Sequence, residues 1–200
     1  SQGSPTGTQC LQAVGCGEAG QIYARVPGIP DGTNRQHADE VTYVSIGDGA
    51  TSEGEFWESL NTACTQPVPV LYLVEDNGYA ISVPVDAQTP GGSISKLVES
   101  FPNLKVLRCD GTDYFDSYRT IDEAVQWIRR ERKPALVHAT VTRPYSHSLS
   151  DDERLYKTPE EREAEAARDP ILKLRTHLLA RGLATDAELL ELAADVDREI

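Results

Sequence analysis

The chain holds 200 residues, of which 39% are hydrophobic and 26% charged, a composition typical of a soluble globular domain. Its net charge of −13 argues against a broad nucleic-acid or membrane-surface interface, because phosphate backbones and anionic lipids are bound by basic patches. No apolar run approaches the roughly 20 residues that a membrane-spanning helix needs. The four cysteines show no CxxC spacing, which favours reduced, structural thiols in a cytosolic protein.

The chain contains no methionine. Because a natural chain starts with one, and "SQGSPTGTQC" reads like the middle of a domain, we expect the sequence to be part of a longer protein. Its first predicted element lies in residues 9–23, which are rich in alanine and glycine and predict a closely packed helix.

A strand–helix–strand unit follows. "VTYVSI" at 41–46 is β-branched and aromatic, which predicts a strand. "EFWESLNTAC" at 55–64 has apolar residues at helical spacing, and "VLYLV" at 70–74 is a continuous apolar run, as expected for a strand buried on both faces. A unit of this kind within about 35 residues predicts a parallel sheet with a right-handed crossover.

The alternation continues to the end of a first domain. Residues 105–109 and 135–142 predict two further strands, and between them a helix begins after Asp113, which suits the N-cap position. Residues 83–95 contain prolines and a glycine pair and predict a loop over the sheet. The expected fold class is α/β, a parallel sheet flanked by helices, in a domain that spans residues 1–158.

After Thr142 the sequence becomes polar and irregular, over a stretch long enough to be functional rather than a simple connector. Three helix starts then follow: a capping box with proline at Thr158, an Asp-Pro pair at Asp169 and a second capping box at Thr185. We expect residues 159–200 to form a helical extension that packs on the same domain or on a partner.

Two polar residues follow consecutive predicted strands. Asp48 lies between glycines after the first strand, and Asn77 follows the next strand, 29 residues later. Gly47-Asp48-Gly49 and Asn77-Gly78, each taken alone, are common turn formers. In open parallel sheets, however, ligands bind beyond the carboxyl ends of the strands, and a crossover brings two such ends to one edge. A carboxylate and an amide oxygen are hard ligands suited to Mg²⁺ or Ca²⁺. Together the two residues predict a magnesium–diphosphate site.

The string "GDGATSEGEFWESLN…NGYAISVPV" resembles the thiamine diphosphate-binding motif in the alpha portion of the decarboxylating dehydrogenase component of 2-oxo acid dehydrogenase complexes. "SPTGTQ" near the start and "RPYSHSLSDDERLYKTPEE" near the end match the same family in the same order. The resemblance covers nearly the whole chain and implies the thiamine diphosphate-binding fold. It is closest to forms in which the alpha and beta portions are fused.

The resemblance assigns roles to individual residues. It implies that Mg²⁺ is bound by the side chains of Asp48 and Asn77 and by the backbone carbonyl of Tyr79. It places the diphosphate against Gly47, Gly49 and Ala50. It places the aminopyrimidine ring, and in some members a K⁺ ion held with Thr8 and Gln9, at Ser4, Pro5 and Thr6. It matches His147 to the active-site histidine, which lies near the cofactor and serves proton transfer and acyl transfer to lipoate.

The sequence departs from the family pattern at two positions. The family often has Asn-Asn where this chain has Asp76-Asn77, but the metal ligand is the second residue, so its position is kept. Glu75 stands where some members carry a phosphate-binding arginine and others a glutamate. Ser148 matches a phosphorylation site of mitochondrial relatives, and an ordinary loop serine is the alternative.

Without the motif, the histidines and one arginine allow other interpretations. His147 lies in a serine-rich loop, where a solvated histidine is the plain alternative. His138, inside a predicted strand, suits a hydrogen-bonded sheet residue, and His37 and His177 suit the surface. Arg143, at a strand end, either pairs with an acidic residue or anchors the loop that follows.

The implied function is thiamine diphosphate-dependent oxidative decarboxylation of a 2-oxo acid, pyruvate or a branched-chain one, with acyl transfer to a lipoyl domain. The implied partners are a beta portion, which supplies the activating glutamate absent here, and the lipoyl-bearing acyltransferase; alone, the chain is expected to be inactive. Alternatives are an acetoin-cleaving or transketolase-like enzyme and a non-catalytic assembly module. We expect a bacterial cytoplasmic protein, with the mitochondrial matrix as the alternative.

Overall fold

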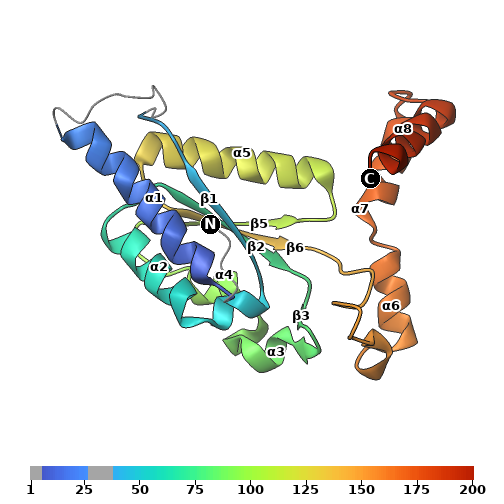
Figure 1. Cartoon of the computed structure of the whole chain (residues 1–200), viewed down its shortest axis with the longest axis horizontal. Coiled ribbons are helices and arrows are strands. Elements are labelled where there is room, and N and C mark those ends of the chain that lie inside the picture. Colours follow the sequence, from blue (N-terminus) through green and yellow to red (C-terminus); the bar gives the residue numbers. More distant parts are fainter. Residues whose placement is uncertain (1–5, 27–37) are drawn as a thin grey trace.

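The computed structural model describes residues 6–26 and 38–200. Its centre is a four-stranded sheet in the order β1-β2-β6-β5, in which each neighbouring pair is parallel (Figure 1). The strands span β1 Thr42–Gly47, β2 Val70–Asp76, β5 Lys105–Asp110 and β6 Ala135–Thr140. The predicted α/β class and all four predicted strands are confirmed, with ends shifted by one or two residues.

Helices cover both faces of this sheet. One face carries α1 (Thr8–Arg25), α2 (Gly54–Thr65) and the short α4 (Ile94–Leu97), and the other carries α5 (Tyr114–Glu131). Side chains alternate across a strand, so neighbours in β2 enter different cores: Tyr72 packs in the first cluster and Leu71 in the second. The sheet is therefore buried on both sides, as the continuous apolar runs of the sequence predict.

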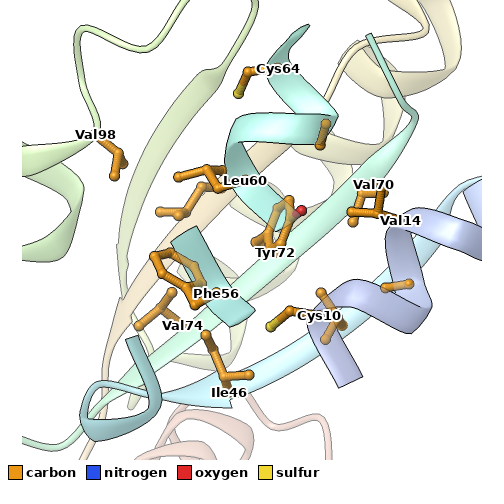
Figure 2. Close-up of a cluster of buried hydrophobic side chains, with 14 of the residues drawn as sticks. Cys10, Val14, Ile46, Phe56, Leu60, Cys64, Val70, Tyr72, Val74 and Val98 are labelled. Atoms are coloured by element: carbon orange, nitrogen blue, oxygen red, sulfur yellow. The ribbon is translucent and has the colours of Figure 1, made fainter. Parts of the chain in front are cut away.

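The larger core lies between the sheet, α1 and α2 (Figure 2). Phe56, Leu60 and Tyr72 are fully buried there, and the rings of Phe56 and Tyr72 meet edge to face at 6.1 Å. Each such side chain contributes roughly 1.5–3 kcal/mol by leaving water. The Tyr72 hydroxyl donates to Ser59 at 3.3 Å, so burial leaves it with a partner. This packing fixes the helix that joins β1 to β2, and with it the two strand ends.

The smaller core lies under α5. Asp113 is the N-cap of this helix, as predicted, because its side chain accepts the backbone N–H groups of Phe115 and Asp116, both at 2.9 Å. Ala124 and Ile128 of α5 are fully buried. The helix returns the chain to β6, whose carboxyl end leads into the polar segment after Thr142.

The segment predicted as a loop, residues 83–95, is more ordered than expected, and that prediction is wrong in detail. A small antiparallel pair joins β3 (Tyr79–Ala80) to β4 (Val83–Pro84). Two short turns of helix then follow, α3 (Val85–Gln88) and a 3₁₀ turn at Pro90–Gly92, before α4. The proline and glycine signals mark these turns rather than an irregular loop.

Three helices end the chain and start where the caps predict: α6 Pro159–Ala166, α7 Pro170–Ala180 and α8 Asp186–Glu199. Thr158 and Thr185 both form complete capping boxes. None of the three helices has a buried residue, and α7 and α8 project from the sheet (Figure 1). The main tie of α7 is polar, from Lys173 Nζ to Asp110 at 3.1 Å. The domain boundary at residue 158 stays a prediction.

None of the described helices is both long enough and apolar enough to cross a membrane.

Candidate functional site

The carboxyl ends of β1 and β2 meet at one edge of the sheet. Gly47 pairs with Glu75 in the parallel register, so the residues that follow the two strands leave the sheet side by side. A Cβ added to Gly49 would lie 2.6 Å from Cβ of Ala80. The turn after β1 therefore packs directly on the segment after β2, and only glycine permits this approach. The convergence expected from the crossover topology is present.

Asp48 is the buried acid of this edge, with 2% of its surface exposed. Gln88 of α3 donates to its Oδ2 at 2.8 Å, while Oδ1 has no hydrogen-bond partner among the described residues. Burial raises the pKa of Asp48, and the negative charge of Asp76 raises it further. The nearby backbone N–H groups of Asp48 and Asn77 lower that pKa only in part. A bound cation would stabilise the ionised form of this carboxylate.

The segment after β2 presents oxygen atoms beside Asp48. Asn77 Oδ1 accepts the N–H of Tyr79 at 3.1 Å, and a carbonyl oxygen with two lone pairs keeps one for another partner. Gly78 turns the chain with φ 82°, a conformation that glycine adopts readily. The strand partner of Tyr79 is Pro84, which has no N–H and cannot donate to the Tyr79 carbonyl.

The donor chemistry of this edge fits a hard cation. No group of three or more His, Cys, Asp and Glu side chains suited to a metal occurs in residues 6–26 and 38–200. A cation here would take one carboxylate with neutral amide and carbonyl oxygens. Mg²⁺ suits such a site, because it commonly uses one or two carboxylates and completes its shell with phosphate oxygens and water.

The N-terminal motif approaches the same edge. A Cβ added to Gly7 would lie 3.1 Å from Cβ of Glu53 and 3.9 Å from the carbonyl oxygen of Ala50. Thr6 precedes this contact and is exposed. The predicted residues Ser4 and Pro5 lie outside the described part of the chain. The end of the "SPTGTQ" motif thus lies beside the turn that follows β1.

A largely buried hydrogen bond between two side chains supports the turn after β2. His138 Nε2 lies 2.7 Å from Asp76 Oδ2, and Asp76 Oδ1 accepts the N–H of Gly78 at 2.8 Å. Burial raises the pKa of Asp76, but the hydrogen bonds from His138 and Gly78 outweigh it and leave the pKa below its ordinary value. His138 is a hydrogen-bonded residue of the sheet, as the sequence indicates.

The loop that carries His147 lies outside this buried group. His147 is exposed, and its backbone N–H donates to Asp151 at 2.8 Å. None of the hydrogen bonds between described residues joins its ring to Asp48 or Asn77. Ser148 is also exposed and lies 3.1 Å from the hydroxyl of Ser150.

Side-chain contacts tether the loop of His147 to the segment after β2, which carries Asn77 and Tyr79. Arg143 donates to the carbonyl oxygen of Ile81 at 3.0 Å and to the Tyr156 hydroxyl at 2.7 Å. That hydroxyl donates in turn to Asp151 at 2.6 Å, and the ring of Tyr156 lies 5.6 Å from that of Tyr79. Arg143 therefore anchors the loop, which confirms one of its two interpretations.

A buried lysine completes the tether. The side chain of Lys157 is fully buried, and its ammonium group binds Glu165 of α6 and lies 3.5 Å from Glu153. It also lies 5.2 Å from the centre of the Tyr79 ring, within cation–π range. Tyr79 thus follows the turn after β2 and contributes its ring to the packing of the loop.

Sequence reasoning missed two residues of this site. Gln88 comes from a segment expected to be a loop, and no spacing rule connects it to Asp48 across 40 positions. Lys157 follows a polar run that suits solvent, yet it is 3% exposed. The flanking carboxylates of "DDERLYKTPEE" are the only signal for it, because a buried lysine requires negative partners.

Known proteins were compared with the chain. It is 36% identical over 179 residues to the 3-methyl-2-oxobutanoate dehydrogenase subunit alpha of Mycobacterium tuberculosis, an alignment of 90% of this chain and 45% of that protein. It is 31% identical to the pyruvate dehydrogenase E1 component subunit alpha of Mycoplasma pneumoniae over 90% of this chain and 50% of that protein. It is 31% identical to the 2-oxoisovalerate dehydrogenase subunit alpha of Bacillus subtilis over 92% of this chain and 51% of that protein.

The chain spans about half the length of these curated relatives. The sequence model of the dehydrogenase E1 component matches residues 2–200, which is almost the whole chain. Together with the strand-end geometry, this match shows that the chain belongs to the dehydrogenase E1 component family.

Proposed function

We propose that this chain supplies the magnesium–diphosphate half of the active site in a thiamine diphosphate-dependent 2-oxo acid dehydrogenase. The observation that carries the proposal is the buried Asp48 carboxylate, whose Oδ1 has no hydrogen-bond partner among the described residues. A buried charge without a partner is costly. Its position beside the Asn77–Tyr79 turn suits a cation that binds together with the diphosphate of the cofactor.

The chain's own residues bind and orient in this scheme. The side-chain oxygens of Asp48 and Asn77 and the carbonyl of Tyr79 bind Mg²⁺, and Gly47, Gly49 and Ala50 let the diphosphate approach the backbone. Ser4, Pro5 and Thr6 hold the aminopyrimidine ring, with K⁺ as a further ligand of that loop. When bound, thiamine diphosphate supplies the carbanion stabilisation that decarboxylation of a 2-oxo acid needs.

His147 acts from the outer side of the site. Its loop contacts the segment after β2 through Arg143 and Tyr156. His147 is exposed, so its ring is accessible for proton transfer. We assign it proton transfer at its imidazole during acyl transfer to a lipoyl group. Exposure in this chain fits a site that is closed by a second portion of the enzyme.

The names of the relatives support the proposed substrate class and the proposed beta portion. Those names give two 2-oxo acids as the compounds dehydrogenated, pyruvate and 3-methyl-2-oxobutanoate, which is also called 2-oxoisovalerate. They also call each relative an alpha subunit, which favours a beta portion as the partner here. The lipoyl-bearing acyltransferase is the second proposed partner.

Asp48→Asn tests the proposal in the assembled enzyme, with the beta portion present. We expect the calorimetric Kd for thiamine diphosphate with Mg²⁺ to rise at least about 100-fold, because the metal loses its one charged ligand. The unfolding midpoint of the cofactor-free variant should stay equal or increase, since asparagine fills the same space without a buried charge.

Asp122→Asn is the matched control, because this aspartate is exposed on α5 and its carboxylate accepts a hydrogen bond from Gln126 on the same helix. It should bind the cofactor as the unmodified enzyme does. Equal cofactor affinity in Asp48→Asn would overturn the assignment of the metal site. Absence of Mg²⁺-dependent binding in the unmodified enzyme would overturn the proposed function itself.

A further inference from the structure

The carboxylate of Asp76 holds the turn that carries Asn77 and Tyr79. Asp76 uses one oxygen for the N–H of Gly78 at 2.8 Å and the other for His138 Nε2 at 2.7 Å. Gly78 lies between the two proposed metal ligands, so the direction of its N–H fixes the direction of both. The orientation of the Asp76 carboxylate therefore sets the orientation of the turn.

His138 holds that carboxylate in place. It lies on β6 opposite Val74 of β2, and its side chain is 8% exposed. Its Nδ1 lies 2.8 Å from the hydroxyl of Ser95, which accepts Nε–H of Arg108 at 2.8 Å. Ser95 is fully buried. Each polar atom in this row has a partner, so the imidazole is fixed at both nitrogens.

The hydrogen bonds suggest a donor order for the row. With a neutral imidazole, Ser95 accepts from Arg108 and donates to Nδ1, and His138 donates from Nε2 to Asp76. Asp76 then accepts from both His138 and Gly78. This tautomer is assigned from the partners in the row. The row connects β5, α4 and β6 to the turn through four side chains.

The backbone cannot do this alone. The carbonyl oxygen of Asp76 accepts the N–H of Val141 at 2.8 Å, which is the last sheet-like bond before the turn. Beyond it, Asn77 and Gly78 are partly exposed and have no partner in the four-stranded sheet. The carbonyl oxygen of Gly78 accepts the N–H of Val85 at 2.8 Å, but the N–H groups of Gly78 and Tyr79 donate to the side chains of Asp76 and Asn77. Side-chain hydrogen bonds therefore take part in setting the path of the chain between Asp76 and Tyr79.

We propose that His138 is a positioning residue of the metal site, which acts through Asp76 on the Asn77–Gly78–Tyr79 turn. The proposal rests on the proposed function, because it concerns the same cation. It also gives Asp76 a role: its carboxylate is a partner for His138 and Gly78 and is not a metal ligand. Partners behind the ligands of a metal commonly affect affinity by about 10- to 100-fold.

The test uses the assembled enzyme and the variants His138→Leu and His138→Gln. Leucine removes both hydrogen bonds, and we expect the Kd for thiamine diphosphate with Mg²⁺ to rise about 10- to 100-fold. Glutamine keeps an N–H donor for Asp76, and we expect it to restore most of the affinity. Amide hydrogen exchange at Gly78, measured without cofactor, should accelerate in the leucine variant and less in the glutamine variant.

Ser45→Ala is the matched control. Ser45 donates to Glu75, the residue before Asp76 on the same strand, at 2.6 Å. Removing this bond should change neither the Kd nor the exchange at Gly78. Should His138→Leu fail to fold, Ser95→Ala removes the bond to Nδ1, together with the bond that Ser95 accepts from Arg108, and leaves Nε2 opposite Asp76. We expect a rise in Kd of about 5-fold.

The outcomes separate the two proposals. An unchanged Kd in His138→Leu, or in Ser95→Ala if the leucine variant does not fold, would overturn the positioning role. A lower unfolding midpoint together with an unchanged Kd would do the same, since that is the result for a purely structural pair. If the Kd is unchanged in His138→Leu while Asp48→Asn loses binding in the same series, the proposed function stands and the positioning role falls. Absence of cofactor binding in the unmodified enzyme would overturn both.

Discussion

The two halves of the proposed site are built by different means. Asp48, Gly49 and Asn77 stand where two parallel strands end, and the crossover helix and its core bring them together. The loop of His147 lies outside the sheet, and contacts between long side chains, above all Arg143 and Tyr156, hold it there. One half is a consequence of topology and the other of a network of polar side chains.

The difference teaches where each half is vulnerable. A close backbone contact with no room for a methyl group tolerates no added atom. A polar network tolerates added atoms but not the loss of a charge, because the remaining partners stay buried without compensation. Apart from loss of the metal ligand Asp48 itself, changes of size should therefore damage the cation half, and changes of charge should damage the His147 half.

The largest effect should come from one methyl group in the cation half. In Gly49→Ala the new Cβ would meet Ala80 at 2.6 Å from its Cβ and 3.2 Å from its Cα. The turn after β1 must then move away from the segment after β2, which separates Asp48 from Asn77. Misplacement of about 1 Å commonly costs about 100-fold, and we expect such a rise in the calorimetric Kd for thiamine diphosphate with Mg²⁺.

Gly54→Ala provides the control for that experiment, because a Cβ on Gly54 has nothing within 4 Å. It lies five residues further along the chain, at the start of α2. Its affinity should equal that of the unmodified enzyme. If Gly49→Ala bound the cofactor equally well, the two strand ends would not need the contact that the structure shows.

The same distinction explains what the sequence could predict. Apolar runs and helix caps identify the four strands, the flanking helices and the starts of α6, α7 and α8, because these patterns act over a few residues. The convergence of Asp48 and Asn77 follows from the parallel topology alone. The elements follow from local sequence patterns, and the convergence adds the rule that a crossover helix joins neighbouring parallel strands.

The remaining contacts have no local signal. Gln88 reaches Asp48 across 40 positions, and Tyr79 meets Glu161 across 82. Such pairs depend on the final packing of surface segments, which spacing and composition do not encode. The partly ordered segment at 83–95 was missed for the same reason: its short helical turns are stabilised by the site they cover, as in the bond of Gln88 to Asp48.

A smaller effect should follow from removing a charge in the His147 half. Lys157→Met keeps the length of the side chain but leaves Glu165 and Glu153 without their buried partner. We expect the free energy of unfolding to fall by about 2 kcal/mol, because the unpaired carboxylates lose a charged hydrogen bond. Urea unfolding measures the change, and amide hydrogen exchange should accelerate in residues 143–157.

Lys173→Met is the comparison for Lys157→Met, because Lys173 also pairs with a carboxylate but is 40% exposed. Exposed ion pairs contribute at most about 1 kcal/mol, so this variant should lose less stability and leave exchange in residues 143–157 unchanged. Equal losses in the two variants would show that burial of Lys157 adds nothing to the tether.

The smallest effect should appear where the helical extension meets the sheet, at Asp110. Hydrogen bonds from Thr112, and then from Lys173, lower the pKa of this carboxyl from 3.8 to about 2. The folded state therefore favours the ionised form, and the contribution is complete above the ordinary pKa and is lost as the pH falls toward about 2. Since the side chain is 45% exposed, solvent limits the gain to less than about 1 kcal/mol.

Asp110→Asn should accordingly be less stable than the unmodified chain near neutral pH, and the difference should shrink as the pH falls below about 4. Urea unfolding at several pH values measures it, with Asp122→Asn as the control, since that exposed aspartate of α5 accepts a hydrogen bond from Gln126 on the same helix. A difference that stays constant down to pH of about 2 would show that Thr112 and Lys173 do not recognise the charge of Asp110. The contrast between topology and charge would then not extend to this third contact.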